Sequence, residues 1–290
     1  MALIQQRTAL AVAGVLLGPM LLLGCGPQPS TTEVGRVWPP PPAPARVKLV
    51  KIVRGASDLG RPSLLEALGN IIVGKSPPPL LRPQGVAVCK DDYLYVADLK
   101  LRGVHVLPLG SGKSVFIDRA EGAPLVSPVG VADFDGKIAV TDSARGEVFL
   151  FTPKGKSIGT IRKPGGFKRP TGLAFAAKDK LLYVVDTLAN EVCVFDLTGR
   201  LVRSFGGRGT GPGKFNYPTH VFVSGDGTAY VTDSLNFRVQ VFDPAGRFLF
   251  QIGTHGDASG HLGMPKGVGV DAQGHIYVVD SYFDTVQVFD

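Results

Sequence analysis

Residues 217–253 decide the fold of this chain of 290 residues. They read YPTHVFV (217–223), SGDG (224–227), TAYVTDS (228–234) and, after Leu235 and Asn236, FRVQVFDPAGRFLFQIG (237–253). Four short segments rich in Val, Phe and Tyr are separated by Gly, Asp, Asn and Pro, which is the pattern of a four-stranded antiparallel meander with tight turns. Because one such unit cannot bury both of its faces alone, we expect it to have copies on either side.

The sequence repeats this unit five times. A proline followed by alternating apolar residues begins each copy, at intervals of 45, 42, 48 and 47 residues: Pro83, Pro128, Pro170, Pro218 and Pro265. A second strand in each copy ends in an aspartate: Asp98, Asp142, Asp186, Asp233 and Asp280. Six residues later a third strand brings in a valine: Val104, Val148, Val192, Val239 and Val286. Repeats of this length with four strands each predict an all-β fold, the β-propeller.

The repeats also resemble a known family. Copies such as 217–253 and 264–290 contain Pro-x-Gly-Val or its variant, a strand ending in Val-x-Asp-Ser, and Val-Gln-Val-Phe-Asp, and these motifs resemble NHL repeats. The linker from Phe205 to Tyr217 is similar to the loop that joins successive NHL blades. The resemblance covers residues 83–290 and implies a propeller with four-stranded antiparallel blades. It implies no particular activity, since one fold carries many functions.

The strand count leaves two arrangements open. The chain stops after the third strand of the fifth copy, and Val47 to Val53 alternates like a single strand without a blade. This segment could supply the missing fourth strand and close a five-blade ring, which would remove exposed strand edges. Alternatively, the chain is a six-blade propeller that lacks one repeat. Between strand and repeats, Ser63 to Ile72 shows a capping box and an apolar stripe, which predict one short amphipathic helix.

The N-terminus resembles a bacterial lipoprotein signal. Arg7 is followed by an apolar run over residues 9–23, and Leu22-Leu23-Gly24-Cys25 is similar to a lipobox. The resemblance implies cleavage after residue 24, a lipid on Cys25 and, because Gly26 is not aspartate, outer-membrane delivery in a Gram-negative host. A plain membrane anchor, or an ordinary export signal with an incidental cysteine, is the alternative. We therefore expect a signal peptide (1–24), a lipidated Pro-rich tether (25–45), an N-terminal strand and helix (46–82) and the propeller (83–290).

Charge is a weaker guide to partners. The chain has 31 Lys and Arg against 24 Asp and Glu, a net charge of +7. An exported protein does not meet cytoplasmic nucleic acid, so we expect no nucleic-acid partner. The net charge has two interpretations. The cations are scattered over a solvated surface, or they attract the protein to anionic lipid headgroups or envelope polysaccharide.

Searches for familiar catalytic and metal motifs find none. Cys89 and Cys193 have no metal-ligand spacing, and there is no phosphate-binding loop, His-Glu-x-x-His or nucleophile elbow. The five strand-terminal aspartates could in principle surround a calcium ion, but an aspartate at a strand end also accepts backbone N–H groups of the turn. Because all five copies share the residue, we expect the structural role, and we expect no metal and no cofactor.

Departures from the repeat mark the candidate ligand-binding residues. The third position of the Pro-x-Gly motif holds Gly85, Gly130, Gly172 and Gly267, but His220 in the fourth copy. A histidine on the strand nearest the channel can titrate, hydrogen-bond or bind a metal. Tyr282, Phe283 and Asp284 place two aromatic residues in a turn, where they suit binding.

These observations lead to one expected function and one alternative. We expect a lipid-anchored propeller in the bacterial cell envelope that is not an enzyme and serves as a binding or scaffolding platform, with a protein partner. The alternative is a propeller hydrolase or lyase, lactonase-like or amidating-lyase-like, with a metal in the central channel. That chemistry requires several converging polar side chains, whereas the first strands offer mainly Val, Ala, Phe and Gly, with His220 and Asp133 as exceptions.

Overall fold

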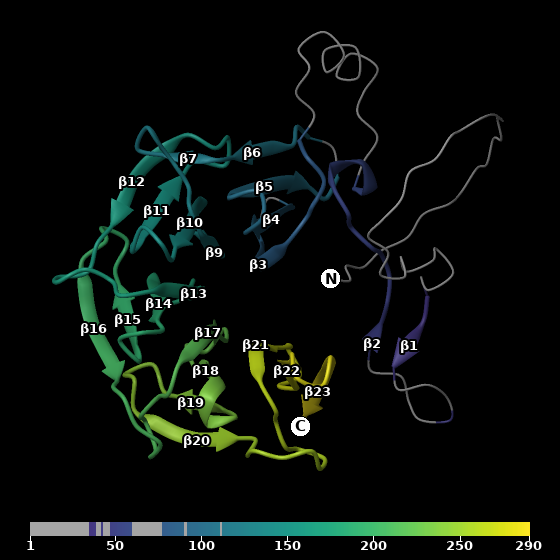
Figure 1. Ribbon diagram of the computed structural model, residues 1–290, viewed down its shortest axis with the longest axis vertical. Coiled ribbons are helices and arrows are strands. Elements are labelled where there is room, and N and C mark those ends of the chain that lie inside the picture. Colours follow the sequence, from purple (N-terminus) through teal and green to yellow (C-terminus); the bar gives the residue numbers. More distant parts are fainter. Residues whose placement is uncertain (1–34, 39–41, 43–46, 60–76, 90–91, 111) are drawn as a thin grey trace, which may run out of the picture.

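The computed structural model describes residues 35–38, 42, 47–59, 77–89, 92–110 and 112–290. Cys25, where we expect the lipid, and the helix expected over residues 63–72 lie outside these ranges. The described chain is all-β, with two short 3-10 turns, η2 (Ala56–Asp58) and η3 (Ser234–Asn236). This confirms the propeller fold and its blade pattern (Figure 1).

Five antiparallel sheets form the blades, and each follows the chain from the inner strand outward. Blade 1 consists of β3 (Pro83–Val88), β4 (Tyr93–Asp98), β5 (Gly103–Pro108) and β6 (Val115–Ile117). Blade 2 consists of β9 (Pro128–Phe134), β10 (Lys137–Asp142), β11 (Glu147–Phe151) and β12 (Ser157–Ile161). Blade 3 consists of β13 (Pro170–Ala176), β14 (Leu181–Asp186), β15 (Glu191–Phe195) and β16 (Leu201–Gly206). Blade 4 consists of β17 (Pro218–Val223), β18 (Ala229–Asp233), β19 (Arg238–Phe242) and β20 (Phe248–Ile252). Blade 5 has three strands, β21 (Pro265–Val270), β22 (Ile276–Asp280) and β23 (Thr285–Phe289).

Smaller strands lie outside the blades. The hairpin of β7 (Arg119–Ala120) and β8 (Ala123–Pro124) connects blades 1 and 2. Strand β1 (Val37–Trp38) pairs with β2 (Val47–Lys48) in a separate sheet. Closure of the ring by residues 47–53 is therefore wrong: the strand in this segment is only two residues long, and it is hydrogen-bonded to β1 instead of to β23. Val53 packs on blade 1 beside Leu94 and Leu107.

The hydrophobic core is divided among the interfaces between successive blades. Four clusters of buried residues join blades 1 and 2, 2 and 3, 3 and 4, and 4 and 5. Blades 2, 3 and 4 contribute alternate side chains to both neighbours, as expected for strands whose residues point to opposite faces of the sheet. The blades are therefore held by face-to-face packing around a common axis.

The arc of blades is open between blade 5 and blade 1, as Figure 1 shows. The pair Val185 and Val192 in blade 3 is fully buried by blade 4, whereas the equivalent pair in blade 5, Val279 and Val286, is 43% and 56% exposed. On the inner strand of blade 1, Val88 is 50% exposed. The outward face of blade 5 thus has no blade against it in the described part of the chain.

Candidate functional site

The five strand-terminal aspartates are fully buried and bind backbone N–H groups. Asp142 accepts from the amides of Val126 (2.7 Å), Ser127 (3.0 Å), Ala144 (3.2 Å) and Arg145 (3.1 Å). Its carboxylate therefore joins the segment before the inner strand to the turn after the second strand. Asp98, Asp186 and Asp280 likewise accept backbone amides from both segments, whereas Asp233 accepts one backbone amide, from Asn216, and otherwise side-chain donors. This bonding supports the structural role expected from the repeat.

The pKa of each of these carboxyl groups is set by the balance between burial, which raises it, and hydrogen-bond donors, which lower it. For Asp98, burial acts to raise the pKa, but four backbone N–H groups outweigh it and the pKa is lowered. For Asp233, burial dominates and the pKa is raised, although Asn216, Asn236 and Arg238 all donate to the carboxylate. These side chains already have their bonding capacity taken up by the protein.

A cavity of about 390 Å³ lies in the central channel. It is lined by the inner strands of blades 1 to 4: residues 86–88, 131–133, 173–175 and 220–223, together with Asp135, Gly136 and Ala177. Most of the lining is apolar, with Val, Ala, Leu and Phe side chains. Asp135 and Gly136 belong to the turn between β9 and β10, so the cavity extends to the end of the ring opposite the buried aspartates.

His220 lies at the end of this cavity that is nearer to the buried aspartates. In blades 1 to 3 the cavity lining begins one position after the motif glycine, whereas in blade 4 it begins at the motif position itself. A Cβ on Gly172 would lie 2.6 Å from the Cα of His220 and 3.2 Å from its Nδ1. The glycine of blade 3 thus leaves the space that the imidazole of blade 4 occupies.

The electrostatic setting keeps His220 neutral. Burial lowers the pKa of His220 to about 4, and no charged group contributes to this shift. At pH 7 the ring therefore presents one donor and one acceptor nitrogen beside an apolar cavity. Such a group can orient a ligand by hydrogen bonding or, through its lone pair, contact a metal.

The second group of candidate residues lies elsewhere. Tyr282, Phe283 and Asp284 form the turn between β22 and β23, and none of them lines the channel cavity. Tyr282 is 70% exposed and its ring meets that of Phe283 edge-on at 5.0 Å. Asp284 has the left-handed backbone conformation that the turn requires (φ 52°). The sequence candidates are thus two separate features, a channel histidine and an exposed aromatic turn.

The structure adds one buried histidine that repeat comparison did not single out. His105 on β5 is fully buried, both of its ring nitrogens lack a hydrogen-bond partner, and its ring packs on Phe116 at 4.8 Å. Burial lowers its pKa, opposed by the charge of Asp98. The corresponding residues of blades 4 and 5 are Gln240 and Gln287, which bind the carbonyls of Lys214 and His261 in the loops before their blades.

The remaining reactive side chains are enclosed. Cys89 and Cys193 are free and buried. Burial raises the pKa of Cys193 to about 12, with the charge of Glu191 acting in the same direction. Across the described ranges, no three His, Cys, Asp or Glu side chains come together as metal ligands. Among the described residues, no helix is long and apolar enough to span a bilayer.

Comparisons with known proteins identify the same fold. A family model described as DUF5128, a 6-bladed beta-propeller, matches residues 174–229. No curated protein matches the sequence. Among solved structures, a selenomethionine-substituted virginiamycin B lyase from Staphylococcus aureus is 15% identical, with a TM-score of 0.55, and the match covers 72% of this chain and 70% of the lyase.

Two further similar structures belong to proteins with different functions. A nidogen/laminin complex matches with 19% identity and a TM-score of 0.58, covering 73% of this chain and 79% of the other. A gluconolactonase from Xanthomonas campestris matches with 22% identity and a TM-score of 0.52, covering 68% and 69%. The similar propellers thus include both binding proteins and enzymes, and the likeness establishes the fold alone.

Proposed function

We propose that this chain is a lipid-anchored propeller of the bacterial cell envelope, built from NHL-type repeats, which acts as a non-catalytic binding platform. Its ligand is a protein or another envelope component. The channel cavity carries the proposal: it is apolar, its size of about 390 Å³ falls in the range of ligand pockets, and neutral His220 supplies one directional contact.

The chemistry of the cavity favours binding. An apolar side chain of a partner gains by leaving water for this lining, and a polar group next to it can pair with the imidazole. The two carboxylates of the lining, Asp133 and Asp135, are tied into the turn region: Asp133 accepts the amide of Gly136, and Asp135 pairs with Lys180. His220 is therefore the polar contact that a ligand would use.

A binding experiment tests this proposal. Full-length protein and the His220→Phe variant, which preserves an aromatic ring of similar size, would be incubated with extracts of the cell envelope and recovered. We expect a component retained by the wild type and by a His275→Phe control to be lost from His220→Phe. Equal retention by all three proteins would contradict a role for the channel.

The lipid anchor has its own test. We expect labelled palmitate to enter the wild-type chain and not Cys25→Ala. Label in both proteins, or in neither, would contradict lipidation at Cys25. This result is independent of what the channel binds.

Enzymatic activity is the second candidate, favoured by a channel histidine that has no hydrogen-bond partner among the described residues, and by the lyase and gluconolactonase folds that the chain resembles. In that case His220 would act with a metal in the channel. A metal bound in stoichiometric amount separates this candidate from the platform.

A further inference from the structure

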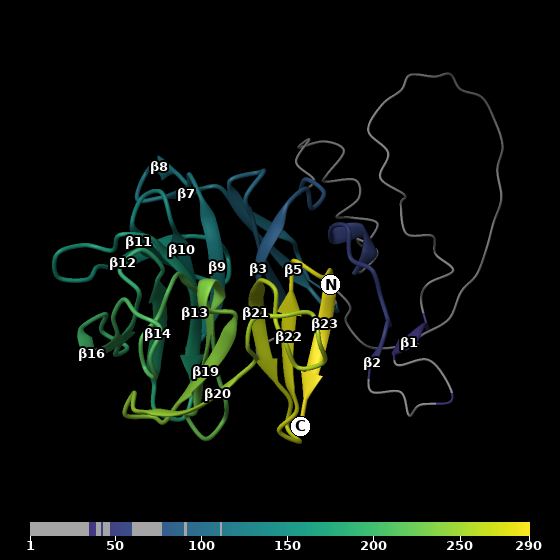
Figure 2. The same cartoon turned by 60° about the horizontal axis from the view of Figure 1, so that its bottom comes forward.

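The ring has two chemically different ends. At one end, which we call the aspartate end, each inner-strand proline pairs with the buried aspartate of the same blade, as Pro218 pairs with Asp233. The turns between second and third strands lie there. The turns between first and second strands, and between third and fourth strands, lie at the opposite end. Figure 2 shows the two ends from the side, with the carboxyl terminus pointing to the opposite end.

Large apolar side chains are exposed at the aspartate end of every blade. They are between 37% and 70% exposed: Leu81, Val126, Leu188, Leu235, Met264 and Tyr282. Four of them are placed by the buried aspartates: the amides of Leu81 and Val126 donate to Asp98 and Asp142, and those of Met264 and Tyr282 both donate to Asp280. Tyr282, like Leu188 and Leu235, occupies one of the turns that follow the aspartates. The repeat geometry therefore holds these side chains at one level of the ring.

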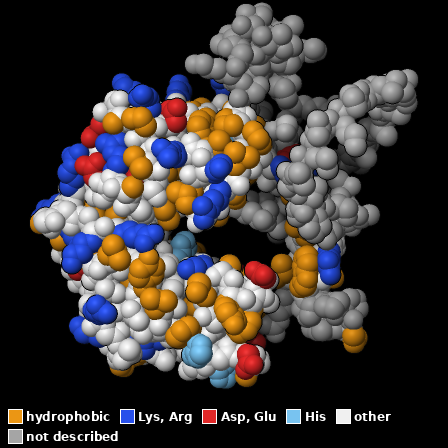
Figure 3. Space-filling view, in the orientation of Figure 1, with side chains coloured by type: hydrophobic (Ala, Val, Ile, Leu, Met, Phe, Trp, Pro, Cys, Tyr) orange, Lys and Arg blue, Asp and Glu red, His pale blue; other side chains and the backbone are white. Residues whose placement is uncertain are grey.

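Cations accompany the apolar residues. Exposed basic side chains come from the same turns and from the starts of the inner strands: Arg82, Lys100, Arg102, Lys168, Arg169 and Lys266. In Figure 3, which looks onto this end, hydrophobic and basic side chains lie along much of the margin of the central opening, with one acidic group at its lower right and further acidic groups toward the left-hand rim. In the turns after the buried aspartates the only acidic residue is Asp284, and the loops before the inner strands add the exposed residues Asp118 and Asp257. Glu121, in the hairpin between blades 1 and 2, is paired with Arg162.

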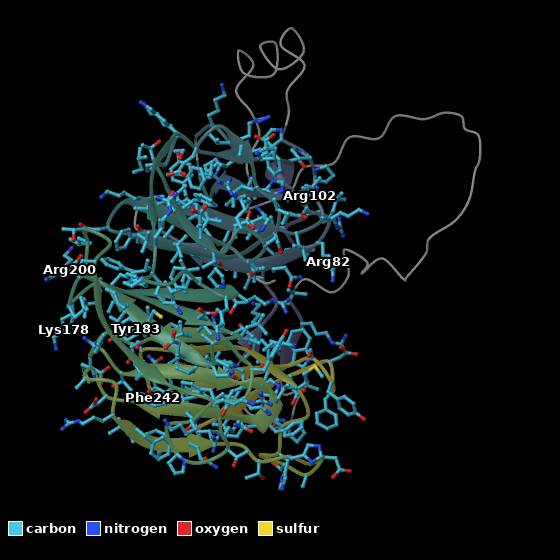
Figure 4. All side chains as sticks on the ribbon, turned by 60° about the vertical axis from the view of Figure 1, so that its left-hand side comes forward. Arg82, Arg102, Lys178, Tyr183, Arg200 and Phe242 are labelled. Atoms are coloured by element: carbon cyan, nitrogen blue, oxygen red, sulfur yellow. The ribbon has the colours of Figure 1, made fainter. Side chains whose placement is uncertain are left out.

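The opposite end lacks this combination of exposed apolar side chains and unopposed cations in its turns. Its turns carry seven aspartates: Asp92, Asp135, Asp179, Asp196, Asp226, Asp243 and Asp271. None of the exposed large apolar side chains of the described chain lies in these turns. Its cations, such as Lys178 and Arg200, are therefore interspersed with carboxylates. Figure 4 shows Arg82 and Arg102 on one side of the molecule and Lys178 and Arg200 on the other.

From this asymmetry we infer that the aspartate end docks on an anionic lipid bilayer. Apolar side chains that enter the headgroup region gain by leaving water, and Lys and Arg beside them are attracted to anionic lipids. An anionic membrane is the partner that matches exposed apolar side chains on all five blades together with exposed cations on blades 1, 3 and 5, whereas a protein partner would need a complementary acidic and apolar surface of its own. The surface is distinct from the channel cavity, so this inference does not depend on the proposed ligand.

Vesicle binding tests the cations. Full-length Cys25→Ala protein, which cannot carry the lipid, would be sedimented with vesicles of equal parts phosphatidylglycerol and phosphatidylcholine. Each cation near an anionic surface contributes about fivefold, so the triple variant Arg82→Gln, Lys168→Gln, Lys266→Gln should bind about 100-fold more weakly. The matched triple variant Lys154→Gln, Lys156→Gln, Lys178→Gln removes the same charge from the opposite end and should change binding little. Equal weakening by both triple variants would overturn the inference.

Fluorescence tests which end enters the bilayer, whatever the N-terminus contributes. Trp38 is the single tryptophan of the chain. In a Trp38→Phe background, Tyr282→Trp should shift to shorter wavelength with vesicles and be quenched by bromine-labelled lipid, while Lys178→Trp should be unaffected. Unquenched tryptophan at position 282, in a variant that unfolds in urea like its parent, would overturn the docking surface and leave a protein as the partner of this end.

Discussion

Two glycines at the same motif position should respond oppositely to alanine. Gly130 of blade 2 faces blade 3, and a Cβ there would lie 2.3 Å from the carbonyl oxygen of Thr171 and 2.5 Å from Cδ2 of Leu173. Gly267 of blade 5 faces the opening of the arc, and its Cβ would meet only Val279 of the same blade, at 3.6 Å. A methyl group at position 130 would therefore force the backbone at Thr171 to move, whereas a methyl group at position 267 would make an ordinary van der Waals contact.

The magnitude follows from these distances. Overpacking against a rigid neighbour costs typically 1–3 kcal/mol, and because the contact at position 130 is with backbone we expect Gly130→Ala to lose about 3 kcal/mol of unfolding free energy. For Gly267→Ala we expect no loss, or a gain of up to about 1 kcal/mol, because alanine restricts the unfolded chain. The two variants should therefore differ by roughly 3 kcal/mol.

Urea denaturation followed by circular dichroism measures the difference, provided that the slope with denaturant is unchanged. With a slope of about 2 kcal/mol/M, the midpoints would differ by more than 1 M. Equal destabilisation at both positions would mean that a blade packs against β21 from the open side. Tolerance of both would refute the close approach of inner strands on which the ring depends.

The remaining predictions concern the buried aspartate and the channel histidine. Asp142→Asn should lose about 2–4 kcal/mol of unfolding free energy in urea melts, because several charge-assisted hydrogen bonds to the backbone are weakened at once. The exposed pair of Asp135 with Lys180 is worth less, so Asp135→Asn should lose less than about 1 kcal/mol. A small loss of stability in Asp142→Asn would contradict the role of this carboxylate in the turn. The His220 ring should titrate near pH 4 by NMR, identified by the resonance missing from His220→Gln. Because its folded-state pKa lies below the unfolded value of 6.5, its contribution is present above pH 6.5 and is lost as pH falls toward 4. A pH dependence of unfolding equal in wild type and His220→Gln would contradict this.

Much of the fold was predictable because the repeat places the same physical requirement in every copy. The proline, the aspartate and the valine six residues later recur because each blade needs a strand start, a turn acceptor and a buried third strand. The observed pairing of Pro218 with Asp233 and of Val231 with Gln240 follows directly from that spacing. Periodicity is a local property of the sequence, so it survives without knowledge of tertiary contacts.

The errors and omissions concern contacts that do not repeat. Alternation in Val47 to Val53 indicated a strand but could not identify its partner, and β2 pairs with β1. His105 resembles any strand residue in the sequence, and only the structure shows that its nitrogens are enclosed without partners. The exposed apolar residues Leu188, Leu235 and Tyr282 could have been found by aligning the turns after each aspartate, because they share one position in the repeat.

Metal analysis of the purified full-length protein tests the proposed binding role most directly. The channel of a non-catalytic platform should contain no calcium, zinc or magnesium in stoichiometric amount, and His220→Phe should have the same metal content as the wild type. One equivalent of metal per chain in the wild type that is absent from His220→Phe would contradict the platform and assign the channel to metal-dependent chemistry.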